Sequence, residues 1–144
     1  MRTPATIGLL LAALIVAAGC QTAQKEVNLV KKPSNYQQVR DIPIPKGFVF
    51  KSSESSLYSG SFRHAELVYM RRNFRKLEPV VRFFKDHMAK AGWELTWQYG
   101  TPQEPKLIFT KGFDQCEILV HIKESMGEEE PFTVARIVLG PSST

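Results

Sequence analysis

The sequence predicts an α+β fold, an antiparallel sheet of about five to six strands with one helix packed on one face. Two observations support this prediction. Residues 77–91 form a segment whose apolar residues recur at three- and four-residue spacing, as in an amphipathic helix. Before and after it lie short segments in which apolar and polar residues alternate, separated by Gly, Pro and Asp.

Residues 1–19 have the three parts of a secretory signal. One positive charge at Arg2 is followed by an uncharged apolar run over residues 7–18, and small residues precede Cys20. The apolar run is too short for a transmembrane helix, which needs about 20 apolar residues. We therefore expect residues 1–19 to be a signal peptide that is removed.

The motif Ala17-Ala18-Gly19-Cys20 resembles the lipobox of bacterial lipoproteins, with Ala17 where Leu is usual. The resemblance implies that the Cys20 thiol carries a diacylglycerol and that the new amine receives a fatty acid such as palmitate. Gln21, rather than Asp, after the cysteine is similar to the Gram-negative class sorted to the outer membrane, facing the periplasm. The alternatives are an ordinary signal peptide cleaved nearby and a retained transmembrane anchor.

The remainder of the chain has the length of one domain preceded by a tether. We expect a lipidated N-terminus and flexible tether over residues 20–40, a single α+β domain over residues 41–141 and a tail over residues 142–144. Residues 21–40 are rich in Lys, Asn and Gln and poor in large aliphatic residues, which is typical of a solvated tether. The net charge of the full chain, +5, is modest.

The first half of the domain predicts extended structure. Pro43 and Pro45 favour an extended segment, and Gly47 permits a turn before a short strand at residues 48–51. A polar loop follows, and then residues 57–62 and 65–70 predict a hairpin. The alternation in the second strand does not decide which face points inward.

The helix expected over residues 77–91 has Pro79 in its first turn, where the missing N–H is harmless. Gly92 is placed to adopt a left-handed conformation after the last turn. Trp93 can then fold back onto the apolar side of the helix.

Four strands follow as a predicted meander, at residues 93–99, 106–111, 115–124 and 132–139. In the first, Trp93, Leu95, Trp97 and Tyr99 alternate with polar residues, which indicates one half-buried face. In the third, Cys116 and its alternate neighbours face the core, while His121 faces the other way.

A second resemblance concerns the domain, which is similar to small uncharacterised domains of bacterial envelope lipoproteins. It implies no known activity. The residues that carry it are Pro45, Gly47, Phe48, Tyr69, Phe83, Phe84, Met88, Gly92 and Trp93.

The sequence predicts no catalytic residue, metal site or cofactor. His64, His87 and His121 lack metal-ligand spacing, and no nucleophile or phosphate-binding motif is present. Cys116 lies on an apolar strand face, where cysteine usually acts as a small hydrophobe. If Cys20 carries a lipid, Cys116 also has no disulfide partner.

The most conspicuous polar feature is a run of basic residues around the start of the helix. A solvated surface is the favoured interpretation, and contact with anionic lipid headgroups, lipopolysaccharide or an acidic protein is the alternative. The residues are Arg71, Arg72, Arg75, Lys76, Arg82 and Lys85.

We expect a lipid-anchored cell-envelope protein that presents a small non-catalytic domain for binding or assembly. Two alternatives remain open. One is a periplasmic enzyme or enzyme accessory, and the other is a small-ligand carrier that uses the aromatic strand of Trp93, Trp97 and Tyr99. The expected partners are the membrane, through the lipid, and an envelope protein or an anionic lipid. The compartment argues against nucleic acid.

Overall fold

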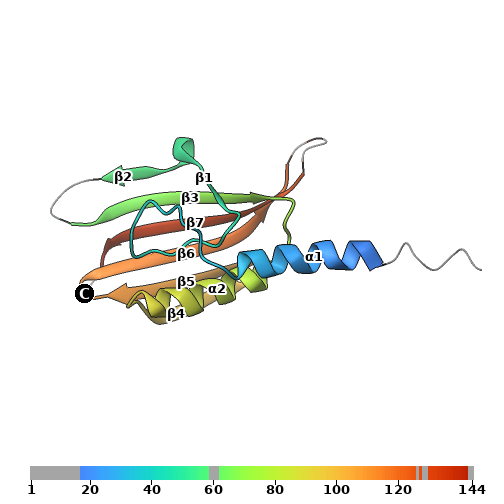
Figure 1. The fold of residues 1–144 in the computed structure, drawn as a ribbon. Helices are drawn as coiled ribbons and strands as arrows, with labels where there is room; N and C mark the ends of the chain where they lie inside the picture. The colour runs from blue at the N-terminus through green and yellow to red at the C-terminus, as the bar shows by residue number, and fades with distance from the viewer. Residues whose placement is uncertain (1–16, 59–61, 126, 128–129, 143–144) are drawn as a thin grey trace, which may run out of the picture.

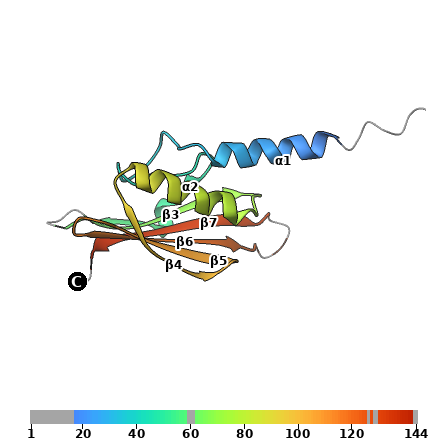
Figure 2. The same ribbon diagram turned by 90° about the horizontal axis from the view of Figure 1, so that it is seen from below.

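The structure is a computed structural model that describes residues 17–58, 62–125, 127 and 130–142, with side chains from Gln24 onward. It confirms the α+β class: two helices accompany an open, antiparallel, seven-stranded sheet, and one helix lies across one face of that sheet (Figures 1 and 2). The sheet has more strands than the predicted five to six because two very short segments pair at one edge.

The strands are β1 (Val49–Phe50), β2 (Ser56–Tyr58), β3 (His64–Arg72), β4 (Glu94–Thr101), β5 (Glu104–Lys111), β6 (Asp114–Lys123) and β7 (Phe132–Pro141). Their order across the sheet is β1-β3-β7-β6-β5-β4, and β2 also pairs with β3. β1 and β2 thus share one edge and are separated by the short 3₁₀ helix η1 (Ser52–Glu54). The last four strands form the predicted meander.

Helix α2 (Leu77–Lys90) carries the chain across the sheet between β3 and β4. β3 pairs with β7, whereas β4 lies at the far edge, so the connection must cross the strands between them. The helix ends as predicted. Gly92 has a φ of +88°, its N–H donates to the Ala89 carbonyl at 3.1 Å, and the Trp93 N–H donates to the Met88 carbonyl at 3.0 Å.

The core lies between the sheet and a layer formed by α2 and the segment that follows α1. Leu67 and Tyr69 of β3 face the helix, as do Cys116 and its alternate neighbours on β6. This register decides the inward face of β3 that alternation left open. The opposite face of the sheet, here called the open face, carries a smaller apolar cluster of Val68, Met70, Val134 and Phe132.

The expected flexible tether over residues 20–40 requires correction. The chain is helical in α1 (Ala17–Val30), which contacts α2, and Val30 is fully buried in the core. Beyond it, the Ser34 N–H donates to the Ile44 carbonyl at 2.7 Å, and the Lys46 N–H donates to the Lys32 carbonyl at 2.8 Å. The few aliphatic residues of this segment are therefore enough to hold it against the domain, because they pack on the apolar surface of the core.

The predicted half-buried face of the aromatic strand is also wrong. Leu95 pairs with Phe109, but Trp97 pairs with Ile108, so a β-bulge at Thr96 shifts the alternation by one residue. Trp97 therefore points to the open face, and all eight residues of β4 are exposed. Trp93 precedes the strand and is buried instead.

Candidate functional site

The structure does not gather the six basic residues around the start of α2 into one surface. Arg71 and Arg72 are consecutive on β3 and point to opposite faces. Arg71 is buried, its Nη1 donates to the Lys46 carbonyl at 3.4 Å, and its guanidinium lies over the Phe74 ring at 5.3 Å. Arg72 lies over the Phe132 ring at 5.5 Å.

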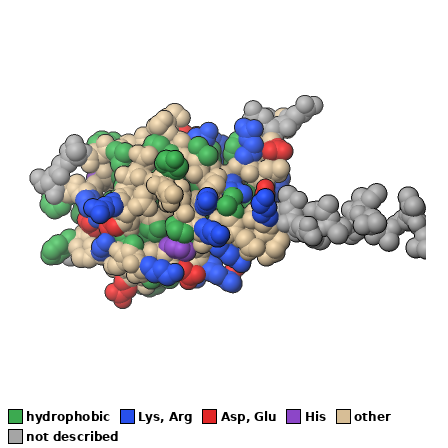
Figure 3. Space-filling view, viewed as in Figure 1, with side chains coloured by type: hydrophobic (Ala, Val, Ile, Leu, Met, Phe, Trp, Pro, Cys, Tyr) green, Lys and Arg blue, Asp and Glu red, His purple; other side chains and the backbone are tan. Residues whose placement is uncertain are grey.

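Two more of the six are paired with acids. Arg75 makes two hydrogen bonds to the Glu124 carboxylate, at 2.8 and 3.2 Å, and Arg82 forms an ion pair with Glu78 one helical turn earlier. Figure 3 shows Lys and Arg side chains toward the α1 end of the helical face, with acids among them. Lys76 is exposed and Lys85 is half-buried. The unneutralised charge of the run is therefore smaller than its composition implies.

Cys116 and His121 do not pair with each other, because they lie on opposite faces of β6. The side chain of Cys20 lies outside the described part of the chain. Burial raises the pKa of the Cys116 thiol to about 12, and His121 faces the opposite side of β6, as predicted. His87 stacks on Phe83 at 4.1 Å.

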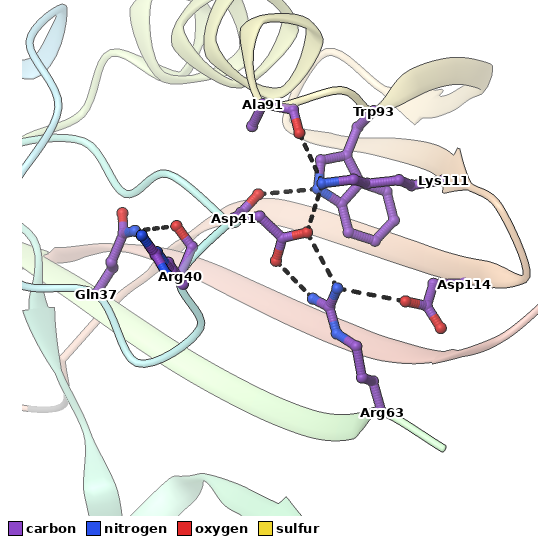
Figure 4. A network of polar contacts seen from close by, with 8 residues as sticks. All are labelled: Gln37, Arg40, Asp41, Arg63, Ala91, Trp93, Lys111 and Asp114. Carbon is purple, nitrogen blue, oxygen red and sulfur yellow. Dashed lines mark hydrogen bonds and ion pairs between the residues drawn. The ribbon is translucent and has the colours of Figure 1, made fainter. Parts of the chain in front are cut away.

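The best-connected polar group is one that the sequence did not single out, here called the Asp41 clasp (Figure 4). The Asp41 carboxylate accepts hydrogen bonds from Arg63 at 2.6 and 3.0 Å and from Lys111 Nζ at 2.8 Å. Lys111 also donates to the Ala91 carbonyl at 2.8 Å. The indole N–H of Trp93 donates to the Asp41 carbonyl at 2.9 Å.

The clasp joins parts of the chain that are distant in sequence. Asp41 belongs to the segment that follows α1, Arg63 precedes β3 and Lys111 ends β5. Partial burial alone would raise the pKa of Asp41, but the hydrogen bonds and charges of Arg63 and Lys111 lower it below its ordinary value. In turn, the hydrogen bond to Asp41 raises the pKa of Arg63.

A depression of about 550 Å³ lies beside the clasp, lined in part by Val39, Arg40 and Ala91. The charged side chains of the clasp pair with one another: Asp41 pairs with Arg63 and Lys111. Arg63 also lies 3.4 Å from the Asp114 carboxylate. The geometry is that of a structural connection, with the acid held ionised by its partners.

The open face is the second candidate. Trp97 and Tyr99 of β4 are 69% and 47% exposed. Val138 is also exposed, on β7, which lies three strands from β4 toward the β1 edge of the sheet. Lys106 lies over the Tyr99 ring at 5.2 Å and pairs with Glu117 at 3.0 Å. The face thus presents exposed apolar side chains beside a charged pair.

The three aromatic residues named in the small-ligand alternative do not share one face of the sheet. Trp93 is buried on the helical side, where its indole N–H serves the clasp, while Trp97 and Tyr99 lie on the open face. Sequence alternation missed this arrangement because a bulge leaves no strong sequence signal here. The sequence indicated which residues of each strand point outward. It did not indicate which of them lie side by side on the open face, because the order of the strands decides that.

Among the described residues no group of three or more His, Cys, Asp or Glu side chains could hold a metal ion. No helix in the described part of the chain is long and apolar enough to cross a membrane. No protein-family model, curated protein or solved structure matches the chain.

Proposed function

We propose that the chain is a lipid-anchored cell-envelope protein whose α+β domain binds a partner protein through the open face, without catalysis. The observation that supports binding is the uncovered sheet face with exposed Trp97, Tyr99 and Val138. An exposed apolar surface bordered by polar groups is typical of an interaction site. An anionic lipid is the less favoured partner, because Arg75 and Arg82 already pair with acids.

The proposed anchor is supported by the motif that ends at Cys20 and by its resemblance to the lipobox. In a Gram-negative cell, Gln21 favours the outer membrane, with the domain in the periplasm. Helix α1 leads from the motif to Val30, so the proposed lipid is attached through a helical arm.

Cys20→Ser is expected to move the protein from the membrane fraction to the soluble fraction. Each buried lipid methylene contributes about 0.8 kcal/mol, so losing the lipid removes the membrane attachment. The measurement is fractionation of cells in detergent-free buffer followed by immunoblotting. Cys116→Ala is the matched control and should remain with membranes. If Cys20→Ser still pellets with membranes, the proposed anchor is wrong.

The binding surface is tested by photo-crosslinking in membranes of the native host. A photoreactive amino acid replaces Trp97 on the open face or, as the control, Lys90 on the exposed end of α2. We expect a discrete crosslinked protein from position 97 and none from position 90, because only the first lies on the proposed contact surface. Equal products from both positions, or none from position 97, would contradict binding through the open face.

A further inference from the structure

The two edges of the sheet differ in length. One edge is made by β1 and β2, which have two and three residues. The other edge is β4, an eight-residue strand that pairs with β5 on one side and with no described strand on the other. A long free edge exposes backbone N–H and C=O groups that can pair with another chain. The sheet can therefore be extended at β4.

The sequence of β4 does little to prevent such pairing. Edge strands are commonly protected by charged residues, by proline, by a bulge or by their short length. Residues 95–101 include no charged residue and no proline, and Glu94 at the start of the strand is its only charge. The bulge lies near that start, and residues 97–101 pair with β5 without a further shift. Most of the strand is thus unprotected.

The backbone of Gln98 faces outward from the sheet. Thr96 Oγ1 donates a hydrogen bond to the Ile108 carbonyl at 3.1 Å, so this carbonyl points toward β4. Trp97 pairs with Ile108 and directs its own backbone groups toward β5. Because these groups alternate in direction along an antiparallel strand, the N–H and C=O of Gln98 point away from β5.

Helix α2 leaves this edge accessible. A groove of about 410 Å³ lies between α2 and the β4–β5 hairpin, lined in part by Val81, Lys85, Gln98 and Pro105. All eight residues of β4 are exposed. An added strand therefore has room for its side chains on the helical side of the sheet as well as on the open face.

The strand is complementary to a second copy of itself. When two identical strands pair antiparallel about a two-fold axis, a residue whose backbone faces outward must meet another such residue. Pairing Gln98 with Gln98 of the other copy meets this condition and places Trp97 opposite Tyr99 of the other copy, on the open face. Facing aromatic side chains stabilise antiparallel strands. The two Glu94 residues then lie at opposite ends of the pair, so like charges do not meet.

We propose that β4 pairs antiparallel with β4 of a second copy, about a two-fold axis at Gln98, so that the two open faces form one continuous surface. A single strand pair is a small contact, so we expect a weak, reversible dimer. The inference does not depend on the lipid anchor or on a different partner protein. In photo-crosslinking from position 97, a product of twice the mass of the chain marks the second copy, and another mass marks a different protein.

The first test is disulfide formation between full-length chains in membranes of the native host. Facing residues of a hydrogen-bonded antiparallel pair have Cα atoms about 5.5 Å apart, which suits a disulfide. Gln98→Cys is expected to give a disulfide-linked dimer under mild oxidation. The native chain and Lys90→Cys, on the exposed end of α2, are the controls and should not. No dimer from position 98, or equal dimer from position 90, would overturn the proposal.

The second test places charges at the two-fold axis. Two differently tagged full-length copies are co-expressed, and one tag is used to recover both in mild detergent. A copy with Gln98→Lys should recover about fivefold more of a copy with Gln98→Glu than of a copy with its own substitution, because opposite charges then face each other. Lys90→Glu in both copies is the control and should behave like the native chain.

Gln98 is exposed, so these variants should keep the native thermal unfolding midpoint, and a change in recovery then reports on pairing. Equal recovery from like-charged and oppositely charged copies would show that the two chains do not meet at Gln98, and would overturn the proposal.

Discussion

Asp41 is the residue that ties the N-terminal segment to the rest of the domain. Its side chain binds Arg63, 22 residues away, and Lys111, 70 residues away, and its carbonyl accepts the Trp93 indole N–H. Nothing near Asp41 in the sequence indicates these partners. Only the folded chain brings the two cations to the same carboxylate.

Asp41→Asn is expected to destabilise the domain by about 1 kcal/mol at pH 7, since it removes a charge that neutralises two partly buried cations. The measurement is chemical denaturation followed by Trp fluorescence, because Trp93 lies in the same cluster. Asp86→Asn, at an exposed position of α2, is the matched control and should change stability little.

The effect of Asp41→Asn should depend on pH in one direction. Arg63 and Lys111 hold the folded pKa of Asp41 below its ordinary value of 3.8. The stabilisation by the carboxylate is therefore fully present above that value and is lost as the pH falls through the lower, folded pKa. The difference between native and variant stability should shrink at acidic pH. A difference that stays constant down to pH values well below 3.8 would contradict the role of the ion pairs.

At the scale of elements, α1 and β4 differ most from their sequence patterns. α1 lies in a segment with the composition of a tether, yet its C-terminal end enters the core through Val30. β4 has the alternation of a half-buried strand, yet it lies at an edge of the sheet and contains a bulge. In both cases the neighbouring elements, rather than the local pattern, decide which side chains are covered.

Val30→Ala is expected to destabilise the domain by about 1–3 kcal/mol, because it leaves a cavity where α1 meets the core. It should also increase proteolytic cleavage between α1 and Asp41, since Val30 attaches this segment. The measurements are denaturation and limited proteolysis. Asn28→Ala, at an exposed position of the same helix, is the matched control. If both variants behave alike, α1 does not depend on this contact.

At the scale of the whole molecule, α2 and the segment that follows α1 cover one face of the sheet, and no helix in the described part of the chain covers the other face (Figure 2). The covered face holds the main core and the Asp41 clasp, and the open face holds the exposed aromatic residues Trp97 and Tyr99. Under the proposed anchor, the helical residues 20–30 span only about 16 Å, because a helix rises about 1.5 Å per residue. The domain would then stay closer to the membrane than a flexible tether would hold it.

The sequence by itself determined the α+β class, helix α2 with its Gly92 stop, the four-strand meander and the opposite faces of Cys116 and His121. These features follow from local periodicity and turn residues, which act within a few positions of the chain. The tertiary structure alone decided the docking of α1, the face of Trp97, the partners of the basic residues and the Asp41 clasp. Each of these depends on contacts between residues far apart in the chain, and those distances become short only when the sheet is assembled.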